Sequence, residues 1–343
     1  MRKLLNILYV TTDGAYLAKD GENVVISVDG EIKMQLPIHT LEGLVCFGYC
    51  GASPALMHFC AESGVGLSFH DPYGKFLARI QGPVQGNVLL RRRQYQAAME
   101  PGTAMDISRN IISAKVVNAR GVLLRAVRER PGDEIAEEMK TVADKLKGAL
   151  GDIQSAHESE RLRGIEGDCA RLYFSVFGHM VLQQQNDFIF SGRTKRPPTD
   201  RLNALLSFLY TMLAHDVQSA LESVGLDPYM GFLHQPRPGR PSLALDLMEE
   251  FRAVLADRVA LSLVNKRQLN AKSFVVKENG AVLLDKDHKK TVLETWFNRK
   301  KDIVQHPFLG EKMEVGLLPY AQALLLARYL RGDLEAYPPY IQK

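Results

Sequence analysis

A histidine and two acidic residues lie close together in the segment 231–252, and their types suit a divalent metal ion. Asp246 and Glu249 are three residues apart on a stretch whose pattern predicts an amphipathic helix, so their carboxylates share one face. A tight turn places His234 shortly before that helix. Carboxylate oxygens suit Mg2+ and Mn2+, and an imidazole adds tolerance of Mn2+. Such an ion polarises a phosphoryl oxygen and activates a water or a sugar hydroxyl.

The turn that joins His234 to the predicted helix is rigid and basic. Three prolines, Pro236, Pro238 and Pro241, restrict its backbone and hold the imidazole in place before an ion arrives. The arginines around it favour an anionic ligand, most simply a phosphodiester. These arginines are Arg237, Arg240 and Arg252. The simpler explanations stay open here: a structural histidine, and acids that favour the dipole of a helix start.

Glu166 is a third acidic candidate, because it lies on an unusual helical face. The pattern places it beside Cys169 and Tyr173, where a carboxylate needs something to neutralise it. A glycine on each side weakens the helix by about 1 kcal/mol apiece relative to alanine, which suggests close approach of a ligand or of another backbone. The alternative is a buried ion pair with Arg163 or Arg171.

Two regions of different periodicity must position these side chains, and together they predict an α+β fold. Residues 1–82 contain short strand-like segments separated by Asp-Gly turns, which predicts a small β-rich domain with an antiparallel meander and one helix at 55–61. The sequence Gly-Pro-Val-Gln-Gly at 82–86 indicates a linker. Residues 83–343 follow helical periodicity, with a hairpin around Asn279-Gly280 and a helix cap at Thr199 or Asp200. The expected helices span residues 88–99, 106–127, 133–150, 155–181, 200–225, 243–264 and 317–330.

The composition describes an ordinary folded protein. Of its 343 residues, 46% are hydrophobic and 24% are charged. No apolar stretch reaches the roughly 20 residues of a membrane span, and no secretory signal is recognisable, so a cytoplasmic setting is expected. Buried free thiols are expected for the four cysteines, because Cys46 and Cys50 lack a second pair at zinc-site spacing. Serine-triad, phosphate-loop and dinucleotide motifs are absent from the sequence.

Basic residues gather in the helical region, although the net charge of the chain is only +4. One such cluster alone is more often a solvated face. Four of them in one region indicate segregated charge, which is typical of a surface that binds DNA. The clusters lie at residues 91–93, 120–130, 193–196 and 286–301.

Three segments together resemble the CRISPR-associated integrases of spacer acquisition, the first protein of the adaptation pair, and most closely their type I-C branch. The first is residues 163–174, with Gly-Ile-Glu-Gly around Glu166. The second is residues 196–210, which begin Arg-Pro-Pro-Thr-Asp. The third is residues 228–252, with His234 and the two acids. Their order is specific to the family, and the resemblance spans nearly the whole chain.

The resemblance implies a sandwich-like N-terminal domain used in dimerisation and a larger, mainly α-helical catalytic domain. It implies a homodimer, and two such dimers bridged by a dimer of a small ferredoxin-like adaptation partner. The implied substrate is double-stranded DNA, both as a captured fragment and as the CRISPR repeat. A 3′ hydroxyl of the fragment attacks a phosphodiester at the repeat boundary, and the fragment becomes a new spacer.

The metal ligands of the family are a glutamate, a histidine and an acidic residue, which correspond to Glu166, His234 and Glu249. Asp246 corresponds to the first acid of the family's Asp-x-x-acid pattern. It serves either as support behind the ligands or as an alternate ligand. Many relatives carry aspartate where this chain has Glu249, so the division of roles between the two acids stays open. The expected DNA contacts are Arg163, Tyr173, Arg196, Asn203, Arg237, Arg240 and Arg252.

Two other functions stay open. A metal-dependent nuclease that mainly cleaves branched DNA would use the same site, with integration secondary or absent. A DNA-binding assembly scaffold with a vestigial site would bind duplex DNA but would have no manganese-dependent chemistry.

Overall fold

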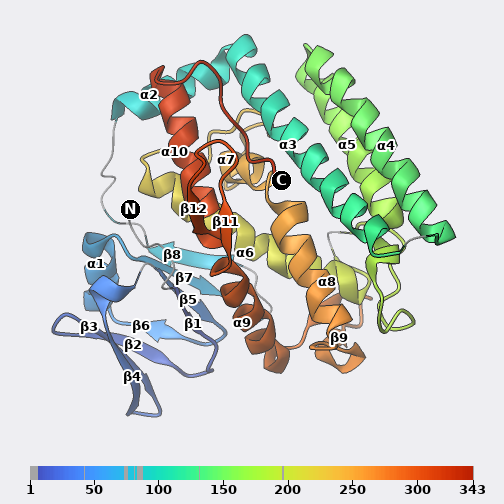
Figure 1. The fold of residues 1–343 in the computed structure, drawn as a ribbon. Helices are drawn as coiled ribbons and strands as arrows, with labels where there is room; N and C mark the ends of the chain where they lie inside the picture. The colour runs from blue at the N-terminus through green and yellow to red at the C-terminus, as the bar shows by residue number, and fades with distance from the viewer. Residues whose placement is uncertain are drawn as a thin grey trace.

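A computed structural model describes residues 7–41, 43–72, 76–80, 82, 88–130, 132–194 and 197–342. A strand-rich N-terminal part is followed by a larger helical part, which confirms the predicted α+β class (Figure 1). The predicted linker lies almost wholly outside the described residues, so the division at residue 82 stays a prediction. None of the described helices combines the length and the apolarity needed to cross a membrane.

The N-terminal part consists of two four-stranded sheets that share one hydrophobic core with helix α1 (Pro54–Ser63). In the first sheet the order is β1-β5-β7-β8, with β1, β5 and β7 parallel. In the second sheet the order is β4-β3-β2-β6. The strands are β1 (Ile7–Val10), β2 (Tyr16–Asp20), β3 (Asn23–Val28), β4 (Glu31–Pro37), β5 (Gly43–Phe47), β6 (Gly51–Ala52), β7 (Gly66–His70) and β8 (Phe76–Ile80).

The predicted antiparallel meander is correct for β2, β3 and β4 and wrong for β1. Asp29 and Gly30 join β3 to β4 with φ angles of 52° and 81°, the left-handed conformation that a two-residue type I′ turn requires. Strand β1 instead pairs with β5 in the other sheet. The next parallel pair in that sheet, β5 and β7, is linked through α1, the kind of crossover that parallel strands need.

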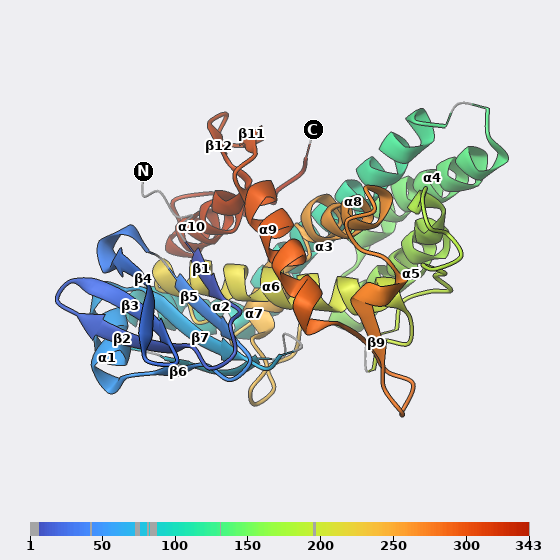
Figure 2. The same ribbon diagram turned by 90° about the horizontal axis from the view of Figure 1, so that it is seen from below.

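The helical part is built around α6 (Arg201–Ser223), which is apolar and buried along much of its length. Helices α7, α8 and α10 pack against it, while α3, α4 and α5 lie together on one flank (Figures 1 and 2). The other helices are α2 (Val88–Met99), α3 (Pro101–Arg128), α4 (Glu134–Ser155), α5 (Ser159–Phe177), α7 (Ser242–Met248), α8 (Arg258–Asn265), α9 (Lys289–Lys300) and α10 (Leu318–Arg331). Short 3-10 helices lie at Ile38–Thr40, Gly178–Met180, Ala271–Ser273, Lys286–His288 and Val315–Leu317.

Two hairpins extend from the helical part. Strands β9 (Phe274–Val276) and β10 (Val282–Leu284) pair antiparallel, which confirms the hairpin predicted around Asn279-Gly280. The second hairpin, β11 (Ile303–Gln305) with β12 (Lys312–Glu314), was not predicted. The expected cap of α6 is also present, since an Asp200 side-chain oxygen accepts the Asn203 backbone N–H at 2.8 Å.

The helix predicted over residues 243–264 is wrong as a single element, because it is interrupted where the two acids lie. Helix α7 ends at Met248, the residues 249–251 form a turn, and Arg252–Asp257 continue as a π-helix before α8 begins. A π-turn holds more residues than an α-turn and often marks a functional site. Here the π-helix sets the direction in which the side chains of Arg252 and Asp257 project from the backbone.

The first sheet packs directly on the helical part. Phe47, at the end of β5, is buried and belongs to the core of the helical part rather than to the core of the two sheets. Its ring centroid lies 6.2 Å from that of Phe208 in α6. At the edge of the same contact, Arg79 of β8 forms an ion pair with Glu222 of α6.

We expect Phe47→Ala to lower the free energy of unfolding by about 3–5 kcal/mol, because it leaves a cavity between the sheet and α6. Denaturant unfolding measures this change. Tyr49→Ala is the matched control, since that ring is 83% exposed and its loss stays within about 0.5 kcal/mol. Equal stabilities for the two variants would contradict the packing described.

Candidate metal centre

Asp246 organises the loop that carries His234. It is fully buried on α7, where its Oδ2 accepts the backbone N–H groups of Phe232 and Leu233 at 2.7 and 3.0 Å. Its Oδ1 accepts the backbone N–H of His234 at 2.9 Å and lies 2.6 Å from the Nδ1 of the same residue. Gly231 is required here, because a Cβ at that position would lie 2.7 Å from Asp246 Oδ2.

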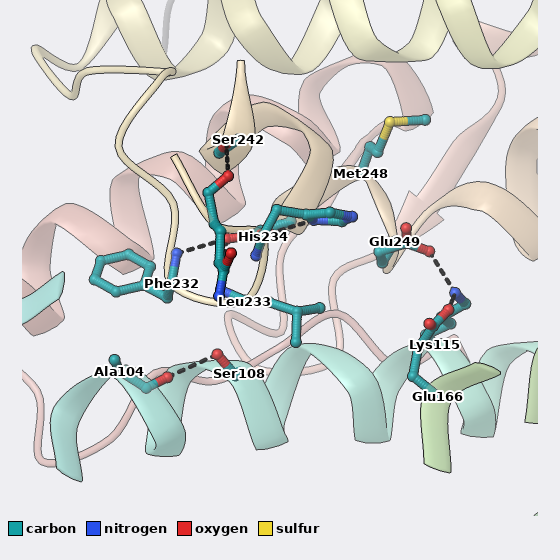
Figure 3. Close-up of polar contacts among 12 residues, drawn as sticks. Ala104, Ser108, Lys115, Glu166, Phe232, Leu233, His234, Ser242, Met248 and Glu249 are labelled. Carbon is teal, nitrogen blue, oxygen red and sulfur yellow. Dashed lines mark hydrogen bonds and ion pairs between the residues drawn. The ribbon is translucent and has the colours of Figure 1, made fainter. Parts of the chain in front are cut away.

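The His234 ring is therefore fixed in orientation and in tautomer. With Nδ1–H donated to Asp246, the Nε2 atom keeps its lone pair. Within the described part of the chain, Nε2 has no hydrogen-bond partner. Figure 3 shows the ring directed toward the side of the site where Met248 and Glu249 lie. The arrangement of carboxylate, imidazole and free nitrogen is the one found behind metal-binding histidines.

Two carboxylates from different elements meet at one lysine. Lys115 of α3 forms an ion pair with Glu166 of α5, and its Nζ lies 2.8 Å from Oε2 of Glu249, in the turn after α7 (Figure 3). Arg252 approaches the other oxygen of Glu249, with Nη1 at 3.0 Å from Oε1. The alternative that Glu166 pairs with Arg163 or Arg171 is wrong, because its partner is Lys115 and Arg171 pairs with Asp168.

Lys115 was not predicted from the sequence. The available signal was a single lysine within Ile-Ile-Ser-Ala-Lys-Val-Val, an apolar stretch of a predicted helix, where a buried cation calls for an acidic partner. The expectation that another backbone approaches the glycines beside Glu166 is also wrong. A Cβ at Gly164 or Gly167 would meet no atom within 4 Å, and Gly167 borders an open cavity.

The charges of Glu249 and Lys115 persist at neutral pH. Burial by itself would raise the pKa of Glu249, but Arg252 and Lys115 together lower it to about 2. Burial would lower the pKa of Lys115, but Glu249 and Glu166 raise it above its ordinary value. Glu166 and Glu249 therefore share the ammonium group of Lys115, and Glu249 also faces the guanidinium group of Arg252.

The side chains fit a divalent cation at the place where Lys115 supplies positive charge. Glu249 Oε2 is buried and, despite its proximity to Lys115, receives no hydrogen bond of acceptable geometry from the described residues. As the side chains stand, no three His, Cys, Asp or Glu groups among the described residues surround a single point. Hard oxygen donors from Glu166 and Glu249, with the free nitrogen of His234, form a donor set suited to Mg2+ or Mn2+ once the ammonium group withdraws.

A cavity of about 490 Å3 is lined by Glu166 and Lys115 together with the arginines Arg171, Arg193 and Arg252. The guanidinium groups of Arg193 and Arg252 both lie over the ring of Tyr210, at 5.2 and 4.8 Å from its centroid. The Nε atoms of both arginines are buried and receive no hydrogen-bond partner from the residues that the structure describes. Unsatisfied cationic donors that line a cavity favour an anionic ligand.

Asp257 also lines this cavity, and it was not predicted from the sequence. Its two oxygens accept the hydroxyl groups of Tyr173 and Tyr210 at 3.0 and 2.6 Å. Burial raises the pKa of Asp257 to about 6, against the lowering effect of the two tyrosine hydroxyls. Tyr173, expected as a DNA contact, thus lines the cavity with its hydroxyl already bound inside the protein.

The remaining predicted DNA contacts differ in how far they are exposed. Asn203 is buried, and it holds Arg193 by accepting a hydrogen bond from Nη1 at 2.6 Å, so it acts within the protein. Arg237 is exposed and Arg240 half-buried in the turn after His234. Arg163 is half-buried on α5. The prediction for Arg196 lies outside the described residues.

The pKa of Asp257 is higher in the folded chain than the unfolded value of 3.8. Its contribution to the free energy of unfolding should therefore fall as pH rises from about 4 to 6 and then level off. The unfolded carboxyl loses its proton first, which favours unfolding by up to about 3 kcal/mol. We expect Asp257→Asn to lack this component. Urea unfolding of both proteins at pH 4, 5, 6 and 7 measures the difference between them, and a difference that does not change with pH would contradict the assignment.

The chain was compared with known proteins. The family model described as "CRISPR associated protein Cas1" matches residues 8–298. A CRISPR-associated endonuclease Cas1 of Rhodospirillum rubrum is 53% identical, with 100% of both chains covered. One of Chlorobaculum tepidum is 49% identical, with 99% of each covered.

Solved structures share the fold at lower sequence identity. A casposase bound to its integration product superimposes with a TM-score of 0.84 at 23% identity, covering 97% of this chain and 93% of its own. A Cas1 protein from Thermotoga maritima gives a TM-score of 0.82 at 23% identity, covering 96% of this chain and 97% of its own. These likenesses concern the arrangement of the elements described above.

Proposed function

Since this chain belongs to the Cas1 family of CRISPR-associated proteins, we propose that it is a metal-dependent DNA endonuclease and integrase of CRISPR adaptation. Relatives of nearly equal length carry the name endonuclease, and the likeness to them extends over the whole chain. Within the family we assign the chain to the type I-C branch, which rests on the resemblance of segments 163–174, 196–210 and 228–252.

The observation that carries the proposal is the pair of carboxylates, Glu166 and Glu249, that face one cation beside the free nitrogen of His234. These three residues would hold Mg2+ or Mn2+, which when bound polarises a phosphoryl oxygen. We assign the acidic ligand to Glu249 rather than Asp246, because both oxygens of Asp246 are already used to hold the His234 loop.

The substrate is the phosphodiester backbone of DNA. Arg193 and Arg252 offer buried cationic donors to a phosphate in the cavity, next to the carboxylates. The ring of Tyr210 contacts both arginines, and Arg193 also donates a hydrogen bond to Asn203. These contacts hold the arginines in place before DNA arrives, which lowers the cost of ordering them on binding. Arg237 and Arg240, in the turn after His234, are placed to meet the duplex outside the cavity.

For partners we propose captured duplex DNA, the CRISPR repeat, a second copy of this chain and a small ferredoxin-like adaptation subunit. One solved chain with a TM-score of 0.84 belongs to a "Cas6-RT-Cas1--Cas2 complex", and all of this chain aligns with part of it. In that complex a Cas1 protein occurs together with a Cas2 protein.

We expect Glu166→Ala and His234→Ala to reduce strand joining by at least about a hundredfold, because each removes a ligand of the ion. The assay joins a duplex with 3′ hydroxyl ends to repeat DNA in the presence of the partner subunit and Mn2+. Glu160→Ala, an exposed acid in the first turn of α5, is the control and should leave joining unchanged. Full joining by either site variant would refute the assignment, and cleavage of branched DNA without joining would favour the nuclease alternative.

Manganese should stabilise Lys115→Met more than it stabilises the wild type. Without the ammonium group, Glu166 and Glu249 repel each other, which destabilises the apo variant by about 3–5 kcal/mol. In the wild type an incoming ion must displace Lys115, whereas in the variant it restores the missing charge. Thermal unfolding with a chelator and with Mn2+ measures both effects, and Lys140→Met on the exposed face of α4 is the control. A variant that Mn2+ does not stabilise would exclude an ion between the two glutamates.

A further inference from the structure

The last described residues of the chain return to the turn that carries Glu249. After α10 the chain runs back toward α3 before it ends, as Figure 1 shows. Tyr337 and Tyr340 of this C-terminal segment (residues 337–342) are buried. The ring of Tyr340 lies 5.6 Å from that of Phe251, which belongs to the same turn as Glu249.

The segment binds the neighbour of Glu249 rather than Glu249 itself. One oxygen of Glu250, Oε1, accepts the Tyr337 hydroxyl at 2.7 Å. The other, Oε2, accepts the Tyr340 backbone N–H at 2.8 Å and Gln322 Nε2 at 2.9 Å. Within the described residues this fully buried carboxylate has no basic partner, so neutral donors alone satisfy it.

Asn118 connects the same segment to the helix that supplies Lys115. Its Nδ2 donates to the backbone carbonyls of Glu250 and Tyr340 at 2.8 and 2.9 Å, and its Oδ1 accepts the Gln342 backbone N–H at 2.8 Å. Asn118 and Lys115 are three residues apart on α3, and so they lie on one face of that helix. One face of α3 therefore contacts both Glu249 and Glu250 in the turn.

The N–H groups of the turn bond to the carbonyls three residues earlier. The distances are 3.2 Å for Glu249, 3.3 Å for Glu250 and 3.0 Å for Phe251. The regular α-helical ladder ends at Met248 and does not resume before the π-helix. Side-chain contacts from outside the turn thus fix the place of its backbone.

We propose that the C-terminal segment positions Glu249 by holding Glu250, and so sets the affinity of the site for its metal ion. Glu250, Asn118 and Tyr337 are positioning residues and touch neither ion nor DNA. The inference rests on the proposed metal-dependent function, with Glu249 as a ligand. The chemical class of the bound species is a divalent cation, Mg2+ or Mn2+.

Tyr337→Phe tests the proposal with the loss of one hydroxyl group. We expect Mn2+ to bind about tenfold more weakly, which is the usual effect of removing a partner behind a metal ligand. Direct binding is measured from the electron paramagnetic resonance signal of free Mn2+. DNA cleavage should need correspondingly more Mn2+, while its rate at saturating Mn2+ stays near that of the wild type. Tyr320→Phe on α10 is the control, because that hydroxyl makes no hydrogen bond to a described residue.

Glu250→Gln is the second variant, and we expect it to weaken Mn2+ binding further, up to about a hundredfold. If it does not fold, Tyr337→Phe decides alone. A lower melting temperature of the metal-free protein with unchanged Mn2+ affinity would mean that the segment only stabilises the fold, and would overturn the proposal. A failure of the proposed metal site would give a different result, because the wild type and Glu249→Ala would then bind Mn2+ equally.

Discussion

The repulsion between the buried carboxylate of Glu249 and the half-buried carboxylate of Glu166 is the constraint around which the helical part of this protein is arranged. Like charges a few ångströms apart in a medium of low dielectric cost several kcal/mol unless a cation lies between or beside them. Glu166 and Glu249 are brought together by α5 and by the turn after α7, and Lys115 and Arg252 supply the positive charge. Four separate elements must therefore reach one point. The central helix α6 and the interruption at 249–251 serve that convergence.

Asp246 and Glu249 illustrate how neighbouring acids acquire different roles from their surroundings. Asp246 is saturated by three backbone N–H groups and one imidazole, so it works as a structural anion that shapes a loop. Glu249 is surrounded by cations and keeps an oxygen without a hydrogen bond. Three residues of separation would have kept both on one helical face, but the helix ends at Met248. The break gives the two acids different neighbours.

The sequence predicted the elements better than the contacts between them. Helical periodicity located α3 to α6 and the Asn-Gly hairpin, because these depend on neighbouring residues. The parallel pairing of β1 with β5 depends on a partner far along the chain, and Asp-Gly turns contain no information about it. The same holds at the site. His234 and the two acids stand close together in sequence, whereas Lys115 and Arg193 come near the site only through packing.

The hydrogen bonds from residues 337–342 to Asn118 and Glu250 have a consequence for the order in which the protein matures. During synthesis, Lys115, Glu166, His234 and Glu249 all leave the ribosome before the residues that hold the turn in place. A nascent chain therefore contains every charged group of the site without its final geometry. The finished arrangement needs residues 337–342, so a product that stops before them would carry these charged residues without their supporting contacts.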